Sequence, residues 1–121
     1  MNHSEKKPLH IIVLVKEDPF QSPRAVEAIR MALGLGSGIN RVDIILMGQA
    51  PYLLTEERDK IADFDTLEKY ISNFEDAEQP FFVEETFLKE HPEFDTIYPY
   101  EPVSREKIAE KMAQGDRFLI F

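Results

Sequence analysis

The seven residues LHIIVLV, Leu9 to Val15, form a nearly continuous apolar run close to the start of the chain. Such a run has no polar side to turn toward water, so it fits a strand covered on both faces, as in parallel sheets. Pro8 before the run and Asp18-Pro19 after it mark its boundaries. The run therefore predicts a parallel sheet with helices packed against both of its faces.

Helical and strand patterns then alternate along the chain. Ser22 and Pro23 open a helix whose apolar residues recur at helical spacing, and the glycines of GLGSG are expected to end it. The other expected elements are a strand over Val42 to Met47, a helical turn near Tyr52 to Leu54, a helix capped by Asp65 with Glu68, a strand over Phe81 to Val83, a helix over Glu85 to Glu90, an edge strand or loop over Thr96 to Tyr100, a helix from Ser104 to Gly115, and a last strand, RFLIF. This alternation predicts an α/β, flavodoxin-like three-layer sandwich with a mostly parallel sheet of about five strands.

Length and composition place the chain among single-domain soluble proteins. It has 121 residues, of which 43% are hydrophobic, enough for one ordinary core. We expect a flexible tail over residues 1–8 and one domain over residues 9–121. The sequence has no apolar run of about 18 residues and no apolar stretch before a cleavage site, so we expect no membrane span and a cytoplasmic location.

Charge and cysteine content exclude several function classes. The formal net charge is −9, so the average surface repels a phosphate backbone, and we expect no direct binding of nucleic acid. The sequence contains no cysteine, which excludes disulfides, thiolate metal sites and a persulfide carrier within this chain. An acidic protein with a protein partner is the simplest interpretation.

The loops and histidines offer no cofactor, metal or nucleophile motif. The loop KEDPFQSPR has no glycine and carries two carboxylates, whereas phosphate binding needs close backbone approach and no like charge. Gly36-Ser37-Gly38 follows a helix, so it is not a nucleophile elbow. His3, His10 and His91 share no metal-ligand spacing, and we interpret all three as structural. We therefore predict no cofactor, no metal and no catalytic residue.

Two carboxylates, Glu84 and Glu85, come directly after a short apolar strand in the segment PFFVEETF. In an open α/β sheet, ligands bind at the carboxyl ends of the strands. One interpretation is that both acids precede the next helix and interact with the positive end of its dipole. The other is that Glu84 projects into a crevice, where a carboxylate can act as a base or bind a cation. The sequence leaves both interpretations open.

Aromatic residues gather late in the chain, and Phe94, Tyr98 and Tyr100 lie in a segment punctuated by prolines. This segment looks too irregular to bury all three side chains within one domain. Exposed aromatic residues of this kind favour a subunit interface. We therefore predict that these three residues, with the C-terminal strand, lie near such an interface.

Five segments carry a resemblance to a known family: HIIVLVKEDPF, SPRAVEAIRMALGL, VDIILMGQAPYLL, PFFVEETFL and GDRFLIF. In order and spacing they resemble the DsrE/DsrF-like sulfur-relay proteins, and most of all the TusC/DsrF type of subunit. The resemblance implies a flavodoxin-like subunit of a homo- or hetero-oligomer that relays sulfane sulfur as a cysteine persulfide, for tRNA thiolation or the oxidation of stored sulfur. It also implies that the reactive cysteine of relay-competent members matches Glu84, or a position within one residue of it.

A carboxylate cannot carry a persulfide, so the resemblance implies a fold and an assembly role without the family's chemistry. The leading hypothesis is a non-catalytic subunit that packs against cysteine-bearing relatives. A second is a homo-oligomeric small-molecule-binding or regulatory protein of the same fold, and a third, ranked last, is an enzyme with Glu84 as general base. The residues expected to line the crevice with Glu84 and Glu85 are Asp18, Pro19, Phe20 and Gly48.

Overall fold

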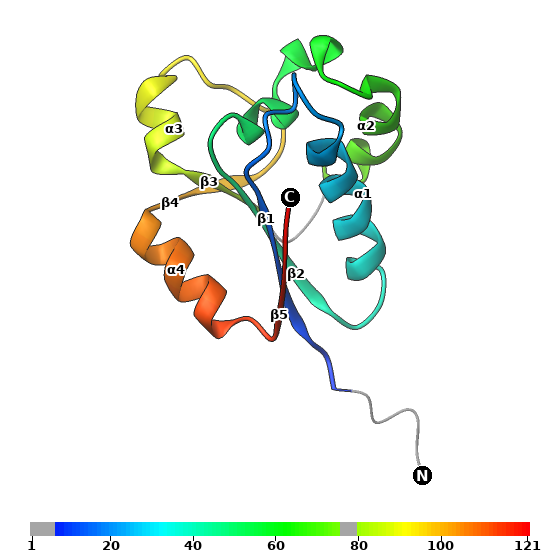
Figure 1. Cartoon of the computed structure of the whole chain (residues 1–121), viewed down its shortest axis with the longest axis vertical. Coiled ribbons are helices and arrows are strands. Elements are labelled where there is room, and N and C mark those ends of the chain that lie inside the picture. The colour runs from blue at the N-terminus through cyan, green and yellow to red at the C-terminus, as the bar shows by residue number, and fades with distance from the viewer. Residues whose placement is uncertain (1–6, 76–79) are drawn as a thin grey trace.

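A computed structural model of the chain describes residues 7–75 and 80–121 (Figure 1). The predicted flexible tail lies mostly outside the described residues. In chain order the elements are β1 (His10–Val15), α1 (Arg24–Gly36), β2 (Arg41–Leu46), the 3₁₀ turns η2 (Ala50–Leu54) and η3 (Glu56–Lys60), α2 (Phe64–Ile71), η4 (Ser72–Phe74), β3 (Phe81–Glu84), α3 (Glu85–Glu90), β4 (Tyr100–Val103), α4 (Arg105–Gln114) and β5 (Arg117–Ile120).

The five strands form one sheet in the order β4-β3-β2-β1-β5, and every neighbouring pair is parallel. This confirms the predicted α/β class, its parallel sheet and its flavodoxin-like plan. The central strands β1 and β2 are almost fully buried, as the apolar run near the start of the chain predicted.

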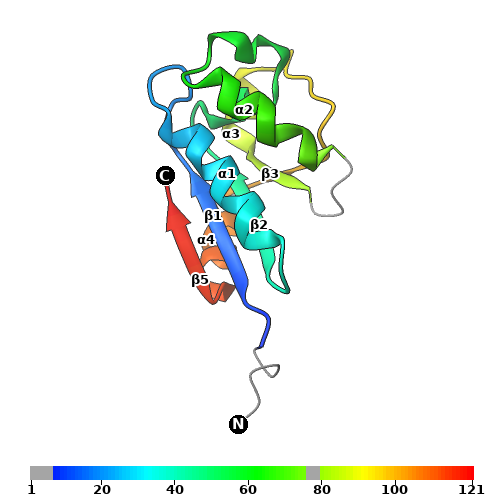
Figure 2. The same ribbon diagram turned by 90° about the vertical axis from the view of Figure 1, so that its right-hand side faces the viewer.

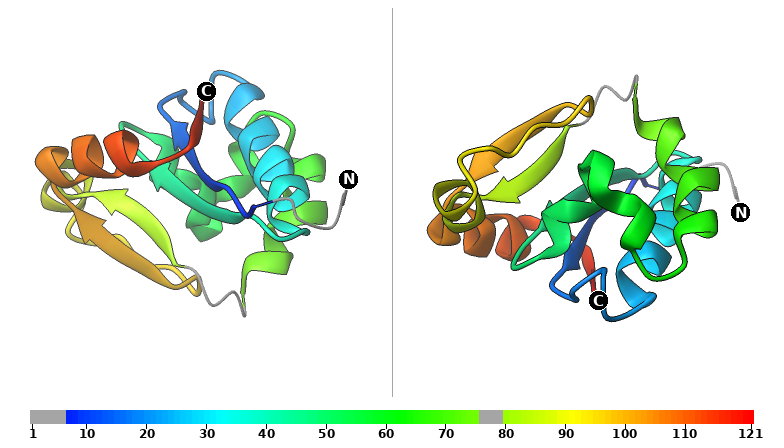
Figure 3. Two further views of the ribbon diagram at one scale, coloured as in Figure 1. Left: turned by 90° about the horizontal axis from the view of Figure 1, so that it is seen from below. Right: turned by 90° about the horizontal axis from the view of Figure 1, so that it is seen from above.

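The order of the strands decides which helices cover which face. From β1 to β4 the chain moves across the sheet in one direction, so right-handed crossovers put α1, α2 and α3 on one face. The return from β4 to β5 runs the opposite way and puts α4 on the other face (Figure 3). The larger core cluster lies on the α1 side, and the smaller cluster, under α4, comprises Ile12, Leu14, Ile45, Phe82, Val103 and Ile108.

Local sequence signals explain most helix ends. The Ser104 hydroxyl accepts a hydrogen bond from the Lys107 backbone N–H at 3.1 Å, so α4 has the predicted N-cap. Helix α1 begins one residue later than predicted, with Pro23 as its N-cap, and continues through Gly34 to Gly36. The glycine-rich stretch therefore ends α1 only at its second glycine.

The predicted capping box at the start of α2 is wrong. The helix begins at Phe64, so Asp65 lies inside its first turn and cannot cap it. The N-cap is Asp63, whose backbone is left-handed with φ 63°, and its side chain makes no capping hydrogen bond. Aspartate tolerates this conformation better than most residues, which explains a turn that the capping pattern could not predict.

The aromatic residues of the α3–β4 segment are more buried than predicted. Tyr98 is buried in the core of its own domain and packs edge-on against Phe81, with ring centroids 6.2 Å apart. Phe94 is partly buried and packs against both Phe87 and Tyr100 at centroid distances of 5.4 and 5.3 Å. Tyr98 is therefore not exposed as expected, because its ring packs against Phe81 at the start of β3, whereas Phe94 and Tyr100 are only partly buried. The place of these residues at a subunit interface stays a prediction.

Candidate functional site

Glu84 is a buried carboxylate at the carboxyl end of the sheet. It is the last residue of β3 and only 4% exposed. It also precedes the first residue of α3, yet its side chain makes no capping hydrogen bond to that helix. The carboxylate instead reaches across the strand ends to residues that follow β2 and that begin α4.

Each oxygen of the Glu84 carboxylate has one hydrogen-bond donor. Oε1 accepts from the backbone N–H of Gly48 at 3.4 Å, and Oε2 accepts from Nε of Arg105 at 3.2 Å. Gly48 has φ +60°, a left-handed conformation that glycine adopts at little cost. A glycine after β2 therefore aims a backbone donor at Glu84, while the guanidinium of Arg105, largely exposed, supplies the opposite charge.

These residues line a cavity of about 530 Å³ between the strand ends and α4. A carboxylate offers about four acceptor sites and a guanidinium five N–H donors, so both groups keep hydrogen-bonding capacity beyond their mutual contact. The cavity can therefore present a donor and an acceptor beside an apolar surface. Its lining residues are Leu14, Lys16, Met47, Gly48, Glu84, Arg105, Ile108 and Ala109.

The location of the cavity follows from the topology. Helix α3 follows β3 on one face of the sheet and α4 follows β4 on the other, so the direction of the outgoing connections reverses between these neighbouring strands. Open α/β sheets bind ligands outside the carboxyl ends of strands at such a reversal. The cavity lies on the α4 face and is lined by Glu84 at the end of β3, by Arg105 at the start of α4, and by residues at or just after the ends of β1 and β2.

Four of the six predicted crevice residues lie elsewhere. Asp18 closes a tight turn, in which its carboxylate accepts a hydrogen bond from the Phe20 N–H at 2.9 Å. Phe20 packs edge-on against Tyr52 of η2, on the α1 side, and Pro19 is buried. Glu85 is exposed in the first turn of α3. Of the predicted set, the structure brings together Glu84 and Gly48.

A second buried carboxylate, Asp43, was not singled out from the sequence. It is 0% exposed on β2, and its carboxylate lies 2.8 Å from Nε2 of His10 and 3.7 Å from Nζ of Lys111. Arg41 approaches the other oxygen at 3.4 Å, and the Lys111 ammonium also lies 3.8 Å from the ring centroid of Phe82. The sequence feature that could have revealed this buried carboxylate is an aspartate inside the apolar stretch VDIILM. The contact with Lys111 joins α4 to the sheet.

His91 is fixed by its own helix. Its Nδ1 lies 2.9 Å from the carbonyl oxygen of Phe87, and its ring stacks on the Phe87 ring with centroids 4.1 Å apart. His10 belongs to the Asp43 cluster, whereas His3 lies outside the described residues. No group of three or more histidine, aspartate or glutamate side chains in the described ranges is placed to hold a metal ion.

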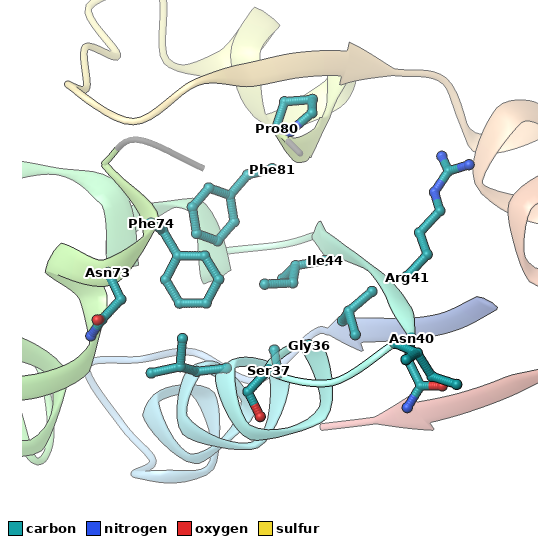
Figure 4. A pocket seen from close by; sticks show the side chains of 13 residues that line it. Gly36, Ser37, Asn40, Arg41, Ile44, Asn73, Phe74, Pro80 and Phe81 are labelled. Atoms are coloured by element: carbon teal, nitrogen blue, oxygen red, sulfur yellow. The ribbon is translucent and has the colours of Figure 1, made fainter. Parts of the chain in front are cut away.

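A further cavity of about 540 Å³ opens at the opposite end of the strands, between α1, β2 and η4 (Figure 4). Its polar side chains are engaged with their own surroundings. The Asn73 amide donates to the Tyr70 carbonyl, the Ser37 hydroxyl donates to the Gly34 carbonyl, and Arg41 belongs to the Asp43 cluster. The surface of this cavity is therefore mostly apolar, and the polar groups of Asn73, Ser37 and Arg41 already make contacts with other parts of the chain.

The fold and the site define an α/β protein with a flavodoxin-like parallel sheet and a buried carboxylate where β3 ends. The chain is similar to the YchN protein from E. coli, with a TM-score of 0.75 and 16% sequence identity over 95% of this chain and 100% of that one. At this identity the likeness shows the fold. No family model and no curated protein sequence matches the chain. None of the helices in the described residues has the length and apolar character needed to cross a membrane.

Proposed function

We propose that this chain is a non-catalytic DsrE/DsrF-like subunit of a cytoplasmic sulfur-trafficking complex and that it assembles with cysteine-bearing relatives. The observation that carries the proposal is the position of Glu84. It lies at the end of β3, in the strand-end cavity, where the family resemblance implies a reactive cysteine. The fold shared with YchN and the absence of cysteine from the sequence are consistent with this role.

The chemistry of the side chain supports a structural rather than a relay role. Sulfane sulfur moves when a thiolate attacks a sulfur donor, and the thiolate then keeps the sulfur as a persulfide. The Glu84 carboxylate has no sulfur atom and already accepts two hydrogen bonds. In this proposal it holds Arg105 and the loop after β2 in place, so that the cavity contributes a shaped, charged surface to the active site of a relative.

Native mass spectrometry of the untagged protein, purified gently from its own host, tests the assembly. The expected result is co-purification with a cysteine-containing relative of the same fold at a fixed ratio. A preparation that contains this chain alone, across several growth conditions, contradicts the proposal.

Substitution of the carboxylate tests the chemical part. Glu84→Cys introduces a thiol beside the Arg105 guanidinium, and a cationic neighbour favours the reactive thiolate. With a small sulfane-sulfur donor, this variant should gain a persulfide that mass spectrometry and thiol labelling detect, and the wild type should not. Glu85→Cys, at the adjacent exposed position, is the matched control. Equal labelling of both variants would remove the special status of the Glu84 position.

A second candidate is a small-molecule-binding or regulatory protein of the same fold. It is favoured by the unused donors of Arg105 and the unused acceptor sites of Glu84 in one cavity. A specific ligand stabilises the folded state by mass action, about 2.7 kcal/mol at a hundredfold excess over Kd. A thermal-shift screen of polar metabolites should then give a ligand whose effect disappears in Glu84→Gln. A screen without such a ligand argues against this candidate.

A further inference from the structure

Strand β5 is an edge strand with an apolar outer side. Within the described chain it pairs only with β1, so its other edge has no partner strand (Figure 2). Phe118 is 56% exposed and Ile120 is 49% exposed. Because alternate residues of a strand share a face, these two side chains lie on one side of the sheet. Their register partners on β1, Ile12 and Leu14, belong to the core under α4, so that side is the α4 face.

The opposite edge of the sheet is protected against pairing, and β5 is not. Strand β4 carries Pro102, which lacks an N–H group, and an exposed carboxylate at Glu101. Prolines and charged side chains are the usual devices that keep edge strands from pairing with other chains. Strand β5 carries one charged residue, Arg117, at its first position, and the four residues after it, FLIF, contain neither proline nor charge. An unprotected apolar edge is a template for adding a strand.

The charge of the chain is distributed so that this edge can approach another copy. Residues 104–121, which contain α4 and β5, hold four basic and three acidic residues, a net charge of +1. The whole chain has a net charge of −9, so the other residues together contribute −10. Two copies that meet through this part of the chain therefore bring together less negative charge than the chain carries on average, and salt should weaken the remaining repulsion.

We propose that two copies of this chain associate by antiparallel pairing of their β5 strands about a two-fold axis. Pairing centred on Leu119 places Phe118 of each copy opposite Ile120 of the other, and residues directly opposite in an antiparallel pair share a face. Four exposed apolar side chains thus cover one another. Because each copy has one unprotected edge, the pair closes as a dimer with a continuous ten-stranded sheet and leaves no free β5 edge for fibre growth.

The same pairing adds to the wall of the strand-end cavity. Ile120 is the register partner of Leu14, which lines that cavity. The second copy's Phe118 therefore lies one strand beyond Ile120 on the same face, about 10 Å from Leu14 at the usual strand spacing. The proposed contact involves one strand of four residues from each copy, so we expect it to bury less than the roughly 800 Å² per partner of a standard stable interface. The dimer should accordingly be weak and depend on protein concentration.

Charge substitutions at the two facing positions test the register. The dimer has two facing pairs, each formed by Phe118 of one copy and Ile120 of the other. In a homodimer of Phe118→Lys or of Ile120→Asp, both pairs hold a charge opposite an apolar side chain. In an equimolar mixture, the heterodimer has one lysine–aspartate pair and one native pair. We expect each variant alone to raise the dimer Kd at least about tenfold, and the mixture to recover most of the loss. Ile97→Lys, at a position that is 67% exposed outside β5, is the matched control and should dimerise like the wild type.

Sedimentation velocity on the purified chain, over a concentration series in salt of about 0.15 M or more, measures these constants. Far-UV circular dichroism checks that the variants fold, which we expect because both side chains are half exposed. A wild type that stays monomeric up to about 1 mM, or β5 variants that dimerise as tightly as the wild type, would overturn the proposal. If each variant alone weakens the dimer but their equimolar mixture dimerises no more tightly, the proposed register is wrong. The proposal goes beyond the proposed function and concerns the chain alone, so its failure leaves the assembly with relatives untouched.

Discussion

Asp43→Asn is the substitution that tests the buried charge cluster most directly. The change removes one negative charge at a fully buried position and almost preserves the volume of the side chain. The amide oxygen can still accept a hydrogen bond from His10, so no cavity results, but the amide NH2 group then faces the donor of Arg41 instead of an acceptor. What is lost is the countercharge of Lys111, which is nearly buried between the carboxylate and the ring of Phe82.

The expected loss of stability is about 3 kcal/mol. At the 3.7 Å separation of Lys111 Nζ and Asp43 Oδ2, the Coulomb attraction is about 4 kcal/mol at an effective dielectric constant of 20. The desolvation of both groups offsets part of this attraction. Removal of one partner of a buried pair nevertheless costs about 3 to 5 kcal/mol, because the other charge stays buried without compensation. We take the lower end because Arg41 and His10 share the carboxylate.

Urea denaturation measures this loss. With a slope of about 2 kcal/mol per molar urea, the midpoint should fall by about 1.5 M, and Asp59→Asn at an exposed position should leave it unchanged. Lys111→Met keeps most of the length of the side chain and removes its charge, so the double variant should show a coupling of at least about 1 kcal/mol. A loss below about 1 kcal/mol for Asp43→Asn, or independent effects of the two changes, would refute this account of how α4 is held.

Three further predictions concern single positions. Gly48→Ala should cost about 1 to 2 kcal/mol in thermal or urea unfolding because of its left-handed backbone, although a Cβ there would meet the Lys16 carbonyl oxygen only at 3.5 Å. Gly115→Ala should cost about 1 to 3 kcal/mol, because its Cβ would lie 2.7 Å from Ile12 Cγ1 in the core; an unchanged midpoint would contradict this. The hydrogen bond from Arg30 lowers the pKa of Glu27 below its ordinary value of 4.5. The stabilisation by this exposed pair is therefore fully present at pH values above the pKa of Glu27 in the unfolded chain. It is lost as the pH falls through the pKa of Glu27 in the folded chain. An NMR titration should give a midpoint below 4.5 that rises in Arg30→Gln.

The fold was predictable because its signals are local. The buried run of β1, the capping serine of α4 and the alternation of strands with helices depend on near neighbours in the chain, and handedness then assigns each helix to a face. The strand-end rule also singles out Glu84 from the sequence alone. The partner Arg105 could not be predicted in the same way, since its approach depends on α4 returning across the sheet from β4.

The features that escaped prediction depend on contacts between distant segments. Asp43 looked like an ordinary polar residue in a strand, because its cations come from β1 and from α4. Tyr98 looked exposed because its segment is irregular, but irregular backbone does not prevent a ring from packing against Phe81. In both cases the sequence shows the residue type, and only the tertiary arrangement supplies the partner.

The two buried carboxylates together determine where α4 lies, and therefore whether the strand-end cavity keeps its shape. Helix α4 has one buried apolar residue, Ile108, so apolar contact alone holds it weakly. Ion pairs hold it at two points, Arg105 to Glu84 in the first turn and Lys111 to Asp43 near its end. Loss of the second contact should thus loosen a wall of the cavity without touching its lining. In Asp43→Asn, hydrogen exchange of the α4 amides should become faster while that of β2 changes less, and Glu84→Cys combined with Asp43→Asn should form its persulfide more slowly than Glu84→Cys alone. Unchanged exchange in α4 would show that the helix is held by other contacts and that the two carboxylates act independently.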